Sequence, residues 1–252
     1  MLLEANTAQN AQISNVRQMV KSTNKEDKLN TLFALPEQKK EHPAKYSDAL
    51  IMTFVEMLRG RNKILDPFCG TGKVFLLNHW YPNAEIQGVE IESEWAVINK
   101  RTTIGDALHL PFADNYFDAI CTSPTYGNRM ADLLIDGYSR LTYTAKLGRK
   151  LSKNNSGGMQ WGKAYRDFHR KAYTEASRVL EPYGCFVLNM KNHIRKGEEQ
   201  FVTSWHIRTL EELGFEVVKT KEVLTPAMRY GQNAEARCEF ESVIKLIKKE
   251  VR

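Results

Sequence analysis

The sequence predicts an α/β fold in which the strands of one mostly parallel sheet alternate with helices. Short apolar runs suited to buried strands recur between Ile64 and Thr122, with stretches suited to helices between them. A loop with two glycines follows the first of these runs, as at the carboxyl edge of a parallel sheet. The length of 252 residues suits one such domain with an insertion better than two independent domains.

The elements follow in order along the chain. Residues 1–40 are polar and are expected to form an amino-terminal arm, and Ser47–Leu58 carries apolar residues at helical spacing. The first four strands are expected to end at Asp66, at Glu90, before Gly105 and at Thr122, with a helix-compatible stretch at Val74–Trp80. The later elements are a helix at Tyr165–Leu180, a strand at Gly184–Met190, a helix at Trp205–Leu213 that stops at Gly214, and a closing antiparallel pair at Phe215–Val223 and Glu239–Ile247.

The loop after the first strand points to a ligand. Gly70 and Gly72 allow a backbone approach that a Cβ would block. The loop lacks the third glycine of the dinucleotide fingerprint and the Gly-Lys-Ser/Thr ending of a phosphate loop, so neither NAD nor ATP is favoured. An acid at the end of the second strand, Glu90, is suited to accept both hydroxyls of a ribose.

Four segments in order resemble the amino-methyltransferases that modify cytosine N4 or adenine N6 in DNA. They are His42-Pro43-Ala44-Lys45-Tyr46-Ser47, Asp66-Pro67-Phe68-Cys69-Gly70-Thr71-Gly72, the two acidic strand ends at Glu90 and Asp106, and Ser123-Pro124-Thr125-Tyr126. The resemblance covers about residues 42–247. It implies a Rossmann-like class I methyltransferase fold over residues 41–252, with a seven-stranded sheet and S-adenosylmethionine as the cofactor.

The resemblance also assigns roles to residues. The expected cofactor-binding residues are His42, Pro43, Lys45, Tyr46, Ser47, Asp66, Phe68, Cys69, Gly70, Gly72, Glu90, Asp106, Ala107 and Ser123. The expected catalytic residues are Ser123, Pro124 and Tyr126. The Ser123 oxygen and the Pro124 carbonyl would accept the N–H groups of the target nitrogen and free its lone pair for the methyl group, while Tyr126 would stack on a base flipped out of the helix. Thr125 stands where the family usually has a second proline.

An insertion at residues 127–166 concentrates the positive charge. Its eight lysines and arginines against two aspartates give a net charge of +6, equal to that of the whole chain. Basic side chains neutralise phosphates and aromatic rings stack on bases, so this mixture favours nucleic acid over a merely solvated surface. The expected nucleic-acid-binding residues are Arg129, Arg140, Tyr143, Arg149, Lys150, Lys153 and Trp161. Asn189, Lys191 and His193 could line the base pocket, and Arg229 could touch phosphate.

These observations predict a DNA amino-methyltransferase of the kind found in restriction-modification systems and bacteriophages. Two alternatives stay open, namely an RNA (tRNA or rRNA) base amino-methyltransferase and a catalytically silent nucleic-acid-binding module of the same fold. The cysteines at 69, 121, 185 and 238 are too scattered for a metal site, and the first three suit small apolar fillers. With no apolar run near the ~20 residues of a membrane span and no signal-peptide pattern, a cytoplasmic, metal-free protein is expected.

Overall fold

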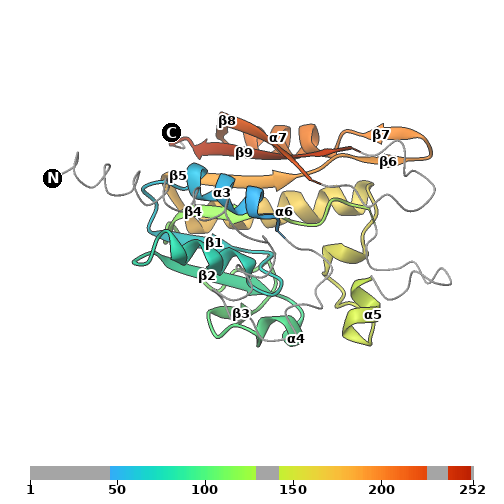
Figure 1. The fold of residues 1–252 in the computed structure, drawn as a ribbon, viewed down its shortest axis with the longest axis horizontal. Helices are drawn as coiled ribbons and strands as arrows, with labels where there is room; N and C mark the ends of the chain where they lie inside the picture. Colours follow the sequence, from blue (N-terminus) through green and yellow to red (C-terminus); the bar gives the residue numbers. More distant parts are fainter. Residues whose placement is uncertain (1–45, 129–141, 226–237, 251–252) are drawn as a thin grey trace, which may run out of the picture. The chain divides into compact units, whose positions relative to one another are not determined.

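The computed structural model describes residues 46–128, 142–225 and 238–250 (Figure 1). The predicted arm at 1–40 lies outside these residues. So do the predictions for His42, Pro43, Lys45, Arg129, Arg140 and Arg229.

Seven strands of the described residues form one sheet in the order β3-β2-β1-β4-β5-β9-β8. The strands β3, β2, β1, β4 and β5 run parallel, and β9 is antiparallel to both of its neighbours. This arrangement confirms the predicted, mostly parallel sheet with its antiparallel carboxyl-terminal pair. The strands are β1 (Lys63–Asp66), β2 (Glu85–Glu90), β3 (Thr102–Ile104), β4 (Phe117–Thr122), β5 (Leu180–Met190), β8 (Phe215–Leu224) and β9 (Phe240–Lys248).

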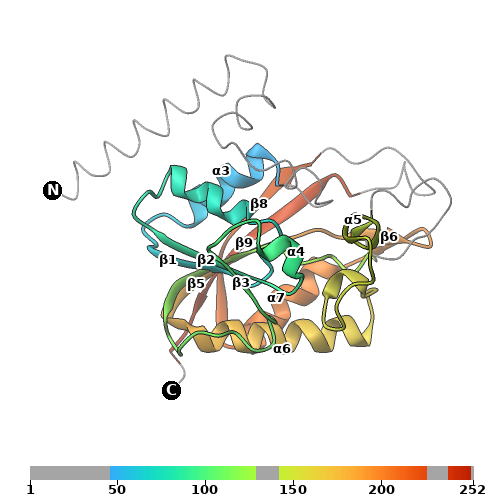
Figure 2. The same ribbon diagram turned by 90° about the horizontal axis from the view of Figure 1, so that it is seen from below.

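Helices cover both faces of the sheet. Figure 2 shows α3 (Asp48–Met57) on one face, and α6 (Lys163–Val179) with α7 (Val202–Glu212) on the other. The Ser47 hydroxyl caps α3 by accepting from the Leu50 N–H at 3.2 Å. The predicted stop after α7 is confirmed, because Gly214 takes the left-handed conformation with φ 90°.

The described structure contains further short elements. The stretch after the glycine loop is a 3-10 helix, η2 (Lys73–His79), in place of the expected ordinary helix, and it begins after Gly72 at φ 81°. A small hairpin of β6 (His193–Arg195) and β7 (Glu198–Gln200) was not predicted, and it turns through Lys196 and Gly197 at positive φ. The remaining elements are α4 (Ser93–Ala96), α5 (Tyr143–Leu147) and η4 (Ser156–Gly158), the last two within the insertion.

Close packing fixes the glycine loop against the sheet. A Cβ at Gly88 on β2 would lie 2.2 Å from the Cys69 Sγ, so only glycine lets the loop lie directly on this strand. Cys69, Cys121 and Cys185 are buried and free, as expected of small apolar fillers. The strand order reverses between β1 and β4, and doubly wound folds bind ligands in the crevice outside the carboxyl ends at such a reversal.

Candidate active site

The carboxyl edge of the sheet holds a cavity of about 760 Å³ that is partly open to solvent. It is lined by residues from several predicted segments, namely Tyr46, Phe68, Cys69, Gly70, Glu90, Asp106, Ala107, Ser123 and Pro124. These residues span almost eighty positions in the sequence, yet they line one cavity, to which both the glycine loop and the Ser123-Pro124 turn contribute.

Glu90 at the end of β2 fixes the glycine loop from inside the cavity. Its Oε2 accepts from the Gly70 N–H at 2.8 Å, and its Oε1 accepts from the Glu92 N–H at 2.8 Å. Burial raises the pKa of Glu90 to about 7, although the two backbone hydrogen bonds act to lower it. A carboxylate has about four acceptor positions, so Glu90 keeps capacity for two more donors.

Asp66 lies beneath the loop and does not line the cavity. Its Oδ1 accepts from the Phe68 N–H at 3.0 Å and from the Thr122 hydroxyl at 2.7 Å. The side chain is fully buried, and this burial raises the pKa of Asp66 to about 6 against the effect of these hydrogen bonds. Asp66 therefore ties β1, the glycine loop and the end of β4 together. This position supports the loop from below, and direct contact of Asp66 with a cofactor stays a prediction.

Asp106 lies in the cavity wall after β3. Its Oδ1 accepts from the Leu108 N–H at 2.9 Å, and its Oδ2 accepts from the Asn154 side-chain amide at 2.6 Å. Asn154 belongs to the insertion, so Asp106 joins the sheet edge to the segment that covers it. Among the predicted cofactor-binding and catalytic residues that the structure describes, Ser47, Gly72 and Tyr126 also do not line the cavity.

The turn after β4 is held from several sides. The Ser123 Oγ lies 3.1 Å from the Tyr126 hydroxyl, and the Tyr165 hydroxyl of α6 donates to the Thr125 carbonyl at 2.5 Å. The Thr125 hydroxyl donates to the Ser156 Oγ in η4 at 2.8 Å. Thr125 thus connects the turn to the insertion through its side-chain hydroxyl, a contact that proline cannot make.

Tyr126 packs beside the turn that carries Ser123. Its ring packs against the core cluster that contains Phe186 and Ile244, and its hydroxyl is bonded to Ser123 and Asn189. Tyr126 is not among the residues that line the cavity, and its stacking on a base stays a prediction.

The described part of the insertion contributes to the cavity, which the sequence did not indicate. Its Tyr143, Asn154, Asn155 and Ser156 form part of the cavity wall. Tyr143 is buried against Trp95 with ring centroids 5.4 Å apart, so it is not the exposed stacking residue that was predicted.

Glu92 holds this cover in place, and the sequence analysis missed it. This fully buried carboxylate accepts from the Ser152 N–H at 2.8 Å, from the Ser152 hydroxyl at 3.0 Å and from the Asn155 amide at 2.7 Å. Burial alone would raise the pKa of Glu92, but these bonds and the Arg149 guanidinium together lower it below its ordinary value. Its position two residues after Glu90 was the only signal in the sequence.

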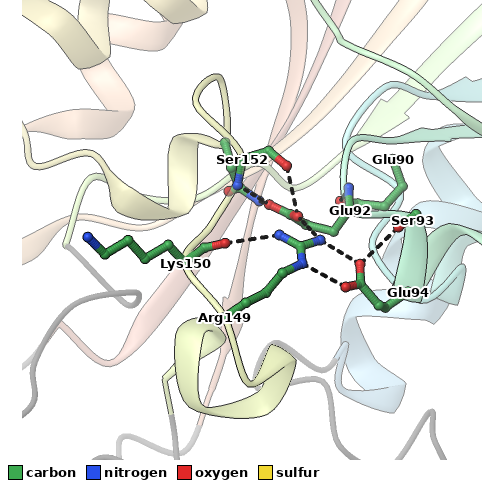
Figure 3. A network of polar contacts seen from close by, with 8 residues as sticks. Glu90, Glu92, Ser93, Glu94, Arg149, Lys150 and Ser152 are labelled. Atoms are coloured by element: carbon green, nitrogen blue, oxygen red, sulfur yellow. Dashed lines mark hydrogen bonds and ion pairs between the residues drawn. The ribbon is translucent and has the colours of Figure 1, made fainter.

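Arg149 belongs to the same network and not to a free basic surface. Figure 3 shows its guanidinium between Glu92 and Glu94, with N···O distances of 2.7 and 2.5 Å. Two carboxylates hold this cation, which gives Arg149 a structural role, and its contact with phosphate stays a prediction. Trp161 is half-buried, with Arg166 over its ring at 5.3 Å. Lys150 and Lys153 are exposed.

Comparisons with known proteins identify the fold. No family model and no curated protein sequence matches the chain. Solved structures do match it, among them the YcgJ protein of Bacillus subtilis, with a TM-score of 0.51 and 16% identity over 80% of this chain and 98% of that one. An S-adenosylmethionine-dependent methyltransferase of Methanosarcina mazei gives a TM-score of 0.51 and 15% identity over 78% and 97%. A geranyl diphosphate methyltransferase in complex with GPP and sinefungin gives a TM-score of 0.52 and 12% identity over 79% and 77%.

These similarities establish the Rossmann-like fold of class I methyltransferases. Within the described residues, no group of three or more His, Cys, Asp or Glu side chains is arranged to hold a metal ion. No helix of these same residues has the length and apolar character of a membrane span.

The raised pKa of Glu90 predicts a pH-dependent stability. Between its ordinary value of 4.5 and about 7, the folded protein holds a proton that the unfolded chain has released, so the free energy of unfolding falls as pH rises through this window. The loss is on the order of 3 kcal/mol for a shift of this size. Replacing Glu90 with Gln removes the titration, so the stability of E90Q relative to wild type should increase between pH 5 and pH 8. Urea unfolding at the two pH values measures this, and a difference that does not change with pH would contradict it.

Proposed function

We propose that this protein transfers a methyl group from S-adenosylmethionine to the exocyclic amino nitrogen of a cytosine or adenine in DNA. The supporting observation is that one cavity joins the glycine loop and Glu90 to the Ser123-Pro124 turn. In this proposal a bound cofactor and a target amine would lie next to each other in the same cavity.

The cavity residues fit the cofactor by their chemistry. Glu90 has acceptor capacity left for two ribose hydroxyls, and Gly70 leaves room for close approach of the loop backbone. Asp106 and Ala107 offer a polar and an apolar contact to an adenine ring, with Phe68 and Phe168 as further apolar walls. When bound, the cofactor supplies an electrophilic methyl group on a sulfonium.

Ser123 and Pro124 would act on the amine. The lone pair of an exocyclic amino nitrogen is conjugated with the base, which makes the nitrogen a poor nucleophile. Hydrogen bonds from its two N–H groups to the Ser123 Oγ and the Pro124 carbonyl would favour tetrahedral geometry and free the lone pair. Positioning of the two reactants supplies most of the acceleration, and no covalent intermediate with the protein is required.

The surface beside the cavity supports a nucleic-acid substrate. Lys150, Lys153 and Lys163 are exposed on the insertion, and Lys163 forms an ion pair with Asp167 at the start of α6. Part of the basic character lies in Arg149, which stabilises the cover and is therefore not counted among the phosphate contacts. The base must be single-stranded or flipped out to reach a cavity under this cover.

Methyl transfer from labelled cofactor tests the proposal. The wild-type protein should label DNA, and replacing Ser123 with Ala should lower kcat by about a hundredfold or more through loss of a bond made in the transition state, with cofactor affinity unchanged. Replacing Ser204 with Ala on the exposed side of α7 is the matched control and should have no effect. Labelling of total RNA but not of DNA would replace the DNA assignment with the RNA one, and labelling of neither would refute the activity.

The salt dependence of DNA binding tests the basic surface. If Lys150 and Lys153 each meet one phosphate, changing both to Ala should reduce the log–log salt slope by nearly two, at about 0.9 for each phosphate. Replacing Arg149 with Ala should leave this slope unchanged and weaken cofactor binding, because the Glu92 network loses its cation. Replacing Lys100 and Lys171, which are also exposed, controls for net charge. An unchanged slope in the Lys150 and Lys153 variant would place the phosphate contacts elsewhere.

A further inference from the structure

The turn after β4 is held by a chain of hydrogen bonds from α6 and α7, which lie on the same face of the sheet (Figure 2). The Tyr165 hydroxyl donates to the Thr125 carbonyl and lies 3.0 Å from the Nε2 of His206 on α7. The Nδ1 of this imidazole lies 2.6 Å from the hydroxyl of Tyr173, about two turns further along α6. The side chains of Tyr165, Tyr173 and His206 are all fully buried. The chain therefore runs from the core to Thr125, which lines the cavity.

The number of available protons fixes the direction of every bond in this chain. A carbonyl oxygen can only accept, so Tyr165 gives its single proton to Thr125. The Tyr165 oxygen can then only accept from His206, whose Nε2 must carry the proton that it donates. Burial holds the pKa of His206 well below its ordinary value, so the ring is neutral and its Nδ1 accepts from Tyr173. Each bond thus has one proton, and each donor has one acceptor.

This direction keeps the Thr125 carbonyl supplied with a donor. An Nε2 without a proton would compete with the carbonyl for the only proton of Tyr165, whereas the protonated Nε2 of His206 removes that competition. The side chain of Thr125 is held separately, because its hydroxyl donates to the Ser156 Oγ. The backbone of Thr125 is therefore fixed to the helical layer, and its side chain to the insertion.

We propose that Tyr165 and His206 are positioning residues that hold the Ser123–Tyr126 turn in place for methyl transfer. This inference rests on the proposed function, in which this turn contacts the target amine. Neither Tyr165 nor His206 lines the cavity, so both act through the backbone of Thr125 and not on a ligand. A displacement of about 1 Å in the reacting groups can lower a rate by about a hundredfold, so a hydrogen bond that fixes the turn contributes to the rate without touching the substrate.

Replacing Tyr165 with Phe tests the proposal, because it removes only the hydroxyl. The Thr125 carbonyl loses its donor, so kcat should fall about tenfold or more, with KM for DNA little changed and cofactor affinity unchanged. Replacing Tyr173 with Phe is the matched comparison, since it removes a buried hydroxyl of the same helix that bonds to the same histidine. The Tyr165 bond to Thr125 remains in this variant, so kcat should fall far less. Equal losses in the two variants, or no loss in Tyr165→Phe, would overturn the proposal.

A double-mutant cycle tests the role of His206. The imidazole acts on the turn through the Tyr165 hydroxyl, so His206→Leu should lower kcat in the wild-type background. It should have less than about a twofold effect in a protein that already carries Tyr165→Phe. His206→Gln, whose side-chain amide can still donate to Tyr165, should retain more activity than His206→Leu. Equal losses for His206→Leu in both backgrounds, or no loss in the wild-type background, would overturn the role of His206.

A spectroscopic readout keeps this test independent of the activity. In protein with ¹³C-labelled threonine carbonyls, the Thr125 resonance reports the hydrogen bonding of that carbonyl. It should shift in Tyr165→Phe and stay in place in Tyr183→Phe, which removes an exposed hydroxyl that bonds to Glu250. If the wild-type protein methylates neither DNA nor RNA, the proposed function fails, while the Thr125 resonance still decides whether Tyr165 holds the turn. An unchanged resonance in Tyr165→Phe would overturn the proposal.

Discussion

Two buried carboxylates at neighbouring strand ends determine the shape of the site. Asp66 and Glu90 both accept from backbone N–H groups of the glycine loop, at Phe68 and Gly70. Since β1 and β2 are adjacent and parallel, the two acids hold one loop from two sides. Burial disfavours the charged form of both carboxylates, as their raised pKa values of about 6 and about 7 indicate. Glu90 lines the cavity with acceptor capacity to spare, so donors from a ligand would offset part of that cost.

A second set of acids attaches the insertion to this core. Glu92 takes hydrogen bonds from Ser152 and Asn155, and Asp106 takes one from Asn154, so the segment that carries basic side chains also encloses the cavity. Nucleic-acid contact and cofactor enclosure would then reside in one segment. Because Thr125 bonds to Ser156, displacement of the cover would also be felt at the turn after β4.

The sequence predicted those features that depend on local pattern. The β4 strand ends at Thr122 as predicted, because its apolar run is closed by Ser123 and Pro124. The loop residues Phe68, Cys69 and Gly70 line the cavity because strand order alone brings a strand-end loop to the carboxyl edge. The position of Glu90 in the cavity wall likewise follows from its place at the end of β2.

The features that the sequence did not predict depend on contacts between segments that are distant along the chain. A charged run reads as solvated surface unless its partners are known, so the ion pairs of Arg149 with Glu92 and Glu94 left no local trace. The burial of Tyr143 was also not predicted, because the Trp95 ring that packs against it lies far away in the sequence. Glu241, on the last strand, accepts from the Asn189 amide only because β9 lies next to β5 in the sheet.

Calorimetric titration of the wild-type protein with S-adenosylmethionine at pH 6 and pH 8 tests the role of Glu90 most directly. Ionised Glu90 accepts ribose hydroxyls at all its free positions, whereas the protonated acid keeps fewer. With a pKa of about 7, the ionised fraction rises from roughly a tenth to roughly nine tenths over this range, so affinity should increase by up to about tenfold. In Glu90→Ala, binding should be weak and independent of pH. Wild-type binding that does not change with pH, or that survives the loss of Glu90, would contradict this role.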